Sequence, residues 1–440
     1  MLPLSALGLI RFDVEDYLTV ESDDALKDML ASMRRAGMPG SYALVGKKVE
    51  ALVERGRFQL LQDLAQERSL GFHSLSHSQH PTIAEELAEL TYDQAVDRFV
   101  EREAPGVDVL TEYVRAPRFF TQPGGNWVPE AAEALPDLGM DLYFTDSFNS
   151  YVVDLDKPYW YGRVVLFSFP VVNPRPFGLG LPGNLNEAVR LIEERQSQSG
   201  AFMVMLHPTE LVTSEFWDVT NYAHGKTRQP LVPAPVRSPQ QQAAALKSFA
   251  QYLQEIRGLR IEWTDAVALR QKVAPRRPIV VNRAQLRDAI RRDGWGPITV
   301  PGGFLSAAEA LYALALVYGA PDARLVNVGY VGAPAAWEAS ASLHAVVASG
   351  RLNDYARALV GAVRDTGRLP SNLDMPLEQI MAALLGEVVP LSFLQYIKDP
   401  PKLHWDWPIF PPHFHPLRLW QDARRLAWTL KPATLTDGSS

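Results

Sequence analysis

Short apolar runs alternate with segments of helical periodicity over the first 270 or so residues of the chain. The first run, residues 7–12, is apolar on both faces and is followed at once by Asp13, Glu15 and Asp16, which is typical of a buried parallel strand with acidic residues at its carboxyl end. Further strands are predicted at 41–45, 69–72, a stretch ending before Arg115, 142–145, 164–169, 201–206 and 260–263, and helices at 23–36, 49–67, 83–103, 129–138, 185–196 and 239–257. About seven such strand–helix steps predict an α/β protein with a (β/α) barrel, whose functional residues collect at the C-terminal ends of the strands.

A change of composition after the barrel predicts a second domain. Residues 274–278 read Ala-Pro-Arg-Arg-Pro, and the sequence then becomes alanine-rich and helical. We therefore expect a barrel over 1–274 and a smaller, mainly α-helical C-terminal domain over 275–440. Residues 285–315 and 357–384 share the order helix, glycine, proline-containing loop, helix, and are candidate repeats. Through Gly-Arg-Leu-Pro370 and the leucine-rich helix after it they faintly resemble pseudomurein-binding cell-wall repeats, which would imply binding to a cell wall or glycan. Within the barrel, the proline-rich stretch 210–238 predicts a long loop over the mouth.

Composition narrows the chemistry. The 440 residues include 43 Lys and Arg against 50 Asp and Glu, a net charge of −7 that gives no reason to expect binding to nucleic acid or an anionic membrane. Cysteine is absent, which excludes disulfides, thiolate nucleophiles and Cys-ligated zinc, so any metal must be held by His, Asp or Glu. No apolar run approaches the roughly 18 to 20 residues of a membrane span, and we expect no transmembrane segment. Both a cytoplasmic and an exported location, and any oligomeric state, are compatible with this composition.

Two clusters suggest a metal site. In an extended strand Asp13 and Glu15 share one face, with Asp16 at the turn beyond, and carboxylates this close together require a cation. The alternative is a helix N-terminus with acidic residues on its dipole. His73 and His77, among only nine histidines, are four residues apart, the spacing that places two imidazoles on one face of a helical turn where they can bind one divalent ion.

Three more residues lie at predicted strand ends. Arg115, followed by Ala-Pro, can direct its guanidinium at a carboxylate and keep it ionised. Asp146 emerges from an apolar strand, and His207 ends another. A single strand-end histidine is usually structural, but Asp146 offers His207 a carboxylate that would raise its pKa and let it act as an acid.

The order of the segments FDVED, HSLSH, RAP, YFTDS and MLHP resembles the five motifs of the polysaccharide deacetylase (NodB homology) superfamily, also called carbohydrate esterase family four. The first segment is most similar to the branch that has DVED in place of the commoner TFDDG. The resemblance extends over residues 7–268 and implies the distorted (β/α) barrel of the deacetylases.

The resemblance also implies a role for each motif residue. Asp13 would be the general base tethered by Arg115, and His207 the general acid oriented by Asp146. The metal, most readily zinc, with cobalt or nickel as alternatives, would be bound by His73 and His77 together with one acid of the first motif. The commoner motif has its ligand acid directly after the base, but here that position is Val14, so the third ligand is Glu15 or Asp16.

The implied activity is metal-dependent removal of N-acetyl groups from an amino-sugar-containing polysaccharide or glycan precursor. A backbone N–H near Asn149 or Tyr151 would stabilise the oxyanion. Phe119, Phe120 and Trp127 would either form apolar walls for a sugar ring or pack in the core. Two alternatives are a C–N amide hydrolase acting on a small molecule, as allantoinase-like members of the superfamily do, and a non-catalytic glycan-binding protein.

Overall fold

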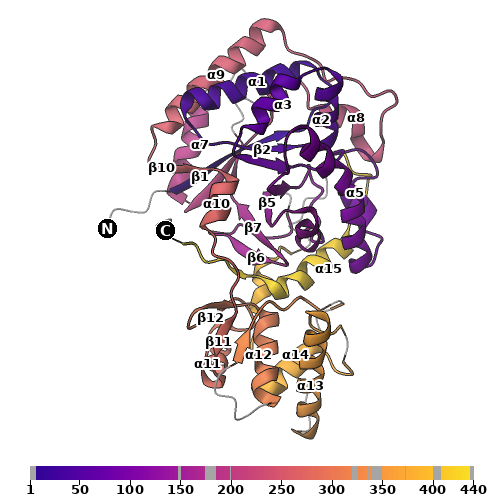
Figure 1. The fold of residues 1–440 in the computed structure, drawn as a ribbon, viewed down its shortest axis with the longest axis vertical. Helices are drawn as coiled ribbons and strands as arrows, with labels where there is room; N and C mark the ends of the chain where they lie inside the picture. The colour runs from indigo at the N-terminus through magenta and orange to yellow at the C-terminus, as the bar shows by residue number, and fades with distance from the viewer. Residues whose placement is uncertain are drawn as a thin grey trace.

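We describe the fold from a computed structural model, which covers residues 6–146, 150–173, 185–198, 200–319, 326–334, 336–337, 349–371, 373–399 and 408–436. The described chain is an α/β barrel with a smaller unit beside it (Figure 1). None of the described helices combines the length and the apolar character that crossing a membrane requires.

One eleven-stranded sheet forms the larger part of the molecule. Strand β1 lies inside it, with β2 and β10 along one edge and β9 along the other. The parallel strands are β1 (Ala6–Val14), β2 (Ser41–Leu44), β3 (Ser69–Phe72), β4 (Phe119–Thr121), β5 (Leu142–Asp146), β7 (Val164–Phe169), β8 (Val171–Val172), β9 (Ala201–Leu206) and β10 (Ile261–Thr264). Two antiparallel strands, β6 (Tyr159–Tyr161) and β15 (Lys431–Pro432), extend the sheet beyond β7.

The sheet curls into a distorted barrel. After β7 the chain passes through Pro170 directly into β8, which pairs with β9 at the opposite end of the sheet, and the Met203 N–H donates to the Pro170 carbonyl at 2.9 Å. The two ends of the sheet are therefore brought together by the chain itself. This confirms the expected fold class.

Side chains alternate between two cores. On β1, Ile10 and Phe12 belong to the outer core under the helices, whereas Leu9 belongs to the inner core of the barrel. The next residues of the inner face are Arg11 and Asp13, so the interior changes from apolar to charged toward the carboxyl end of the strand. The outer face is covered by α1 (Glu21–Ala36), α2 (Gly46–Glu54), α3 (Phe58–Ala65), α5 (Tyr92–Tyr113), α7 (Leu185–Gln198) and α9 (Pro239–Arg257) (Figure 1). The short helices α4 (Ile83–Leu87) and α6 (Ala131–Ala134) also pack on this outer core, whereas Ala266 and Leu269 of α10 (Ala266–Lys272) belong to the inner core.

One strand was placed wrongly. The predicted strand before Arg115 is absent, because α5 continues to Tyr113 and β4 begins only at Phe119. Arg115 therefore precedes its strand instead of following it, and it lies at the end of the barrel remote from the carboxyl ends.

The smaller unit is mainly helical, with α11 (Arg283–Asp293), α12 (Ala307–Gly319), α13 (Ser349–Thr366) and α14 (Leu377–Leu385). It also has two small sheets, β11 (Ile279–Val281) with β14 (Val326–Val328), and β12 (Ile298–Val300) with β13 (Gly303–Leu305). Both candidate repeats have a helix–loop–helix order, but in the part of the chain that the structure describes only the first contains a hairpin, β12–β13.

The end of the chain returns to the barrel. After α15 (Leu417–Leu426), strand β15 pairs with β6. From β15, Lys431 forms a buried ion pair with Glu309 of α12, with Nζ–Oε distances of 2.7 and 2.9 Å. The segment after 408 thus contacts both parts of the molecule, while the boundary at 274/275 and a binding role for the repeats stay predictions.

Candidate metal centre and catalytic cavity

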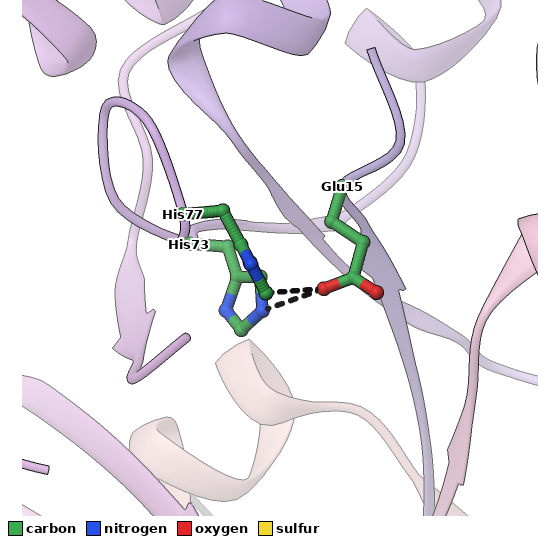
Figure 2. A group of neighbouring side chains, drawn as sticks. All are labelled: Glu15, His73 and His77. Carbon is green, nitrogen blue, oxygen red and sulfur yellow. Dashed lines mark ion pairs between the residues drawn. The ribbon is translucent and has the colours of Figure 1, made fainter. Parts of the chain in front are cut away.

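Three of the predicted residues come together at the carboxyl ends of the strands. Glu15 directly follows β1, His73 directly follows β3, and His77 lies in the loop beyond it. Figure 2 shows both imidazole rings directed at the carboxylate of Glu15. One ligand atom from each residue lies within 4.8 Å of the other two, and all three side chains are buried.

The hydrogen bonds around the two histidines set their tautomers. His73 Nδ1 donates to the Thr121 carbonyl at the end of β4, at 2.9 Å, so its Nε2 presents a lone pair 3.6 Å from Glu15 Oε2. His77 Nδ1 is 2.7 Å from Ser78 Oγ, whose own proton goes to Asp218 Oδ2 at 3.1 Å. His77 Nδ1 must therefore be the donor to Ser78, and His77 Nε2 also turns a lone pair toward Glu15.

Three acceptor atoms thus converge on one point. Among the described residues, His77 Nε2 and Glu15 Oε1 have no hydrogen-bond partner. Buried acceptors that face one another require a cation between them, and two imidazoles with one carboxylate are a donor set that zinc, cobalt or nickel accepts. The residues therefore fit a divalent metal, and Glu15, His73 and His77 are the ones that would hold it.

The electrostatics of the group agree with a cation there. Burial opposes ionisation of Glu15, yet the neighbouring His77 and His207 hold its pKa well below its ordinary value. Burial likewise opposes a charge on His77, but the pKa of His77 is raised because Glu15, Asp218 and Asp13 surround it. The surrounding carboxylates therefore favour a positive charge at this site.

His77 reaches the group by an unusual backbone conformation. We expected His73 and His77 on one face of a helical turn, and this is wrong: the segment is a loop, with His77 at φ 53° and Ser74 at φ 68°. The Ser74 hydroxyl accepts the His77 N–H at 2.9 Å and stabilises that turn. Left-handed residues other than glycine often occur at functional sites, where the surrounding contacts hold them in place.

Asp16, the alternative third ligand, is not part of the group. Its Oδ1 accepts the N–H groups of Leu18 and Thr19 at 3.0 and 2.9 Å, and its Oδ2 accepts the Thr209 hydroxyl at 2.6 Å. The carboxylate closes the turn after β1 and faces away from the histidines. Of the two acids considered, Glu15 is the one at the metal group.

Arg11, and not Arg115, binds Asp13. Arg11 Nη2 donates to Asp13 Oδ2 at 2.7 Å, and both side chains are buried. They share the inner face of β1 because they are two residues apart on a strand. Arg115 instead donates to the backbone carbonyl of Arg68 at the other end of the barrel, so its predicted role as the tether is wrong.

His207 lies beside Asp13 at the end of β9. Its Nε2 is 3.7 Å from Asp13 Oδ2 and 3.9 Å from Glu15 Oε1, and its Nδ1 is 3.3 Å from Glu210 Oε2. Burial lowers the pKa of His207, but Glu15, Glu210 and Asp13 raise it to about 10. The side chain of Asp146, the predicted partner of His207, and the whole of Asn149 lie outside what the structure describes; Glu210 is the carboxylate that contacts Nδ1.

Phe119 and Trp127 are core residues. Phe119 fills the barrel interior, where its ring lies so close to Gly71 that a Cβ there would approach it to 2.2 Å. Trp127 packs outside the barrel against Tyr143 and Tyr151, fully buried. Neither lines the cavity at the metal group, so their prediction as sugar-contacting walls is wrong, because rings this deeply packed cannot meet a ligand.

The cavity above the metal group has a volume of about 250 Å³. Its floor is polar and its walls include Met205, Phe216 and Val219. Phe216 meets the His207 ring edge-on at 5.2 Å between centroids. Phe216 and Val219 belong to the stretch 210–238, which we predicted as a loop over the mouth; it does border the cavity, but it contains the helix α8 (Trp217–Tyr222).

Sequence reasoning missed Arg11, Glu210 and Asp218. Arg11 carried a usable signal, because it shares the strand face of Asp13 and Glu15. Glu210 stands three residues after His207, a spacing that indicates a possible contact. Asp218 had no such signal, since only the fold brings it to Ser78.

No protein-family model and no curated protein matches this chain. Solved structures do. A Mycobacterium smegmatis protein provisionally assigned as a polysaccharide deacetylase is 14% identical, with 62% of this chain and 94% of that chain covered and a TM-score of 0.39. The peptidoglycan deacetylase PdaC from Bacillus subtilis is 12% identical, with coverages of 62% and 93% and a TM-score of 0.33. BA3943 from Bacillus anthracis, a pseudoenzyme of carbohydrate esterase family four, is 10% identical, with coverages of 61% and 66% and a TM-score of 0.34.

These structures belong to the superfamily that the five motifs indicated, and nothing in them distinguishes its DVED-type branch. At such identities and TM-scores they do not bear on the activity or substrate of this chain.

Proposed function

We propose that this protein is a metal-dependent hydrolase that removes N-acetyl groups from an amino-sugar-containing glycan. One observation carries the proposal: the acceptor atoms of Glu15, His73 and His77 converge beside Asp13 and His207, within a single cavity at the carboxyl ends of the strands. A divalent ion bound there would polarise an amide carbonyl and acidify a water molecule.

The protein's own residues divide the proton transfers. Asp13 is held by Arg11 through Oδ2 and keeps Oδ1 without a hydrogen-bond partner among the described residues, so it can take a proton from a water in the cavity. His207, protonated and fixed by Glu210, faces Asp13 across the site and can give a proton to the departing amine. Asp146 remains a proposed contributor to orienting His207, and a backbone N–H near Tyr151 a proposed oxyanion donor.

The small cavity supports a second candidate. A volume of about 250 Å³ is at or below the usual range for small-molecule pockets, and α8 borders one side. This favours a small substrate, such as a linear or cyclic amide hydrolysed at C–N, or only the end of a glycan entering the site.

Metal content and product release test the proposal together. Elemental analysis of the wild-type protein should give about one zinc, cobalt or nickel per chain, and a His73→Ala/His77→Ala variant should lose it. The matched control is His80→Ala in the same loop, because His80 binds Glu85 and the Tyr222 carbonyl instead of the metal group.

Acetate release from N-acetylglucosamine oligomers and peptidoglycan fragments then identifies the reaction. Release that disappears with the metal supports the deacetylase. Metal without acetate, but with hydrolysis of small amides, would select the second candidate. A folded wild-type protein that binds no metal after reconstitution would leave a non-catalytic glycan-binding protein.

A further inference from the structure

Asp218 reaches the metal group from a part of the chain outside the five motifs. It lies on α8, is fully buried, and accepts the Ser78 hydroxyl at 3.1 Å. Ser78 is also fully buried and accepts from His77 Nδ1 at 2.7 Å. A continuous chain of hydrogen bonds therefore joins the carboxylate of α8 to the ring of His77.

This chain determines which nitrogen of His77 carries its proton. A serine hydroxyl has one proton, and the carboxylate of Asp218 can only accept it. Ser78 Oγ must then accept from Nδ1–H, which leaves Nε2 unprotonated and facing Glu15. Without Asp218 the hydroxyl is free to turn and donate to Nδ1, and the tautomer with Nε2–H, which cannot bind a metal, becomes available.

The position of α8 is itself fixed by contacts with the barrel. Trp217 is fully buried and packs against His77 and Tyr17, with ring centroids 5.4 and 4.8 Å apart. The hydroxyl of Tyr222, the last residue of α8, is hydrogen-bonded to the hydroxyl of Tyr17. Asp218 is therefore presented by a packed helix, which is the rigidity that a positioning residue needs.

We propose that Asp218 is a positioning residue of the metal centre, acting through Ser78 to hold His77 in its metal-binding tautomer. The inference rests on the proposed metal site and adds to it a residue from the stretch 210–238. That stretch then helps to build the centre as well as bordering the cavity.

A double-mutant cycle on the full-length protein tests this, with Co²⁺ as the probe and its dissociation constant measured by competition with a chromophoric chelator. Ser78→Ala and Asp218→Ala should each weaken binding by about 10- to 100-fold. Because Asp218 acts through Ser78, the double variant should bind no more weakly than Ser78→Ala alone. Ser78→Thr, which keeps the hydroxyl, should restore binding to within a few-fold of wild type.

The control is Glu215→Ala, an exposed acid in the same stretch, which should leave the affinity unchanged. Asp218→Leu keeps the branched shape of the side chain, removes both acceptor oxygens, and replaces Asp218→Ala if the latter does not fold, as judged by thermal melting. Multiplicative losses in the double variant, or an unchanged affinity in Asp218→Ala, would overturn the inference, as would wild-type protein that binds no Co²⁺. Wild-type protein that binds Co²⁺ with the expected cycle, but releases no acetate, would uphold the inference and reject the deacetylase.

Discussion

Replacing Arg11 by methionine would remove the cation of the Arg11–Asp13 ion pair on the inner face of β1. Arg11 and Asp13 are 2% exposed each, and their contact at 2.7 Å is the one hydrogen bond between ionised groups that Arg11 makes among the described residues. Methionine fills most of the same volume and leaves the Asp13 carboxylate buried, with His207 Nε2 3.7 Å away.

The expected loss of stability is large. Removing one partner of a buried ion pair costs about 3–5 kcal/mol. His207, protonated and 3.7 Å from Asp13, still compensates part of the charge, so we expect a loss at the lower end, about 3 kcal/mol. The matched control is Arg115→Met, since Arg115 is the arginine that the motif order indicated but lies at the opposite end of the barrel. That variant should change the free energy of unfolding by less than about 1 kcal/mol, as is usual for a single hydrogen bond near the surface.

Urea denaturation of the chelator-treated proteins would measure the free energy of unfolding of both variants and of wild type. Asp13→Asn and the double variant Arg11→Met/Asp13→Asn complete a cycle in which the double variant should lose clearly less than the sum of the single losses. In the metal-loaded protein, Arg11→Met should lower acetate release by about 100-fold, because the carboxylate of Asp13 is no longer held in place. An Arg11→Met protein as stable and as active as Arg115→Met would refute the assignment of Arg11 as the partner of Asp13.

Three further substitutions test other parts of the structure. Burial raises the pKa of Glu103 to about 7. Between its ordinary pKa and 7 the folded state therefore holds a proton that the unfolded state has lost, and the free energy of unfolding falls as the pH rises through that range. In urea denaturation, the free energy of unfolding of Glu103→Gln relative to wild type should rise by roughly 2–4 kcal/mol between pH 4.5 and 8, and a pH-independent difference would contradict this. Gly71→Ala should lower the melting temperature by several degrees, because its Cβ meets the Phe119 ring, and an unchanged value would show that the ring moves freely. Lys431→Met should lower the free energy of unfolding by about 3–5 kcal/mol in urea denaturation, because it leaves the charge of Glu309 buried and unpaired. The double variant Lys431→Met/Glu309→Leu should recover most of that loss, and equal losses in both variants would argue against the pair.

Periodicity was a good guide to the elements of the barrel. The runs that became β2, β3, β5, β7 and β9 were recognisable because strands buried on both faces are apolar throughout. The short strands β6, β8 and β15 were not, because two or three residues are too few to show a period. The strand before Arg115 failed because Pro105 and Gly106 indicate the end of a helix, whereas α5 continues through Pro105 to Tyr113.

The metal residues followed from local patterns to different degrees. Strand alternation favoured Glu15 over Asp16, and the structure places Glu15 with His73 and His77. The spacing of the two histidines was informative although its helical explanation was wrong, since a left-handed turn brings the rings together as well.

The sequence alone predicts that Asp13, Glu15 and His73 lie at the carboxyl ends of strands, because strand alternation and strand ends are local properties. The partners of those residues depend on how distant segments pack. Asp218 meets Ser78 across 140 positions of sequence, and Phe119 lies in the barrel interior only because the sheet curls around it. Long-range packing decides such contacts through the shapes of whole elements, which no short stretch of sequence contains.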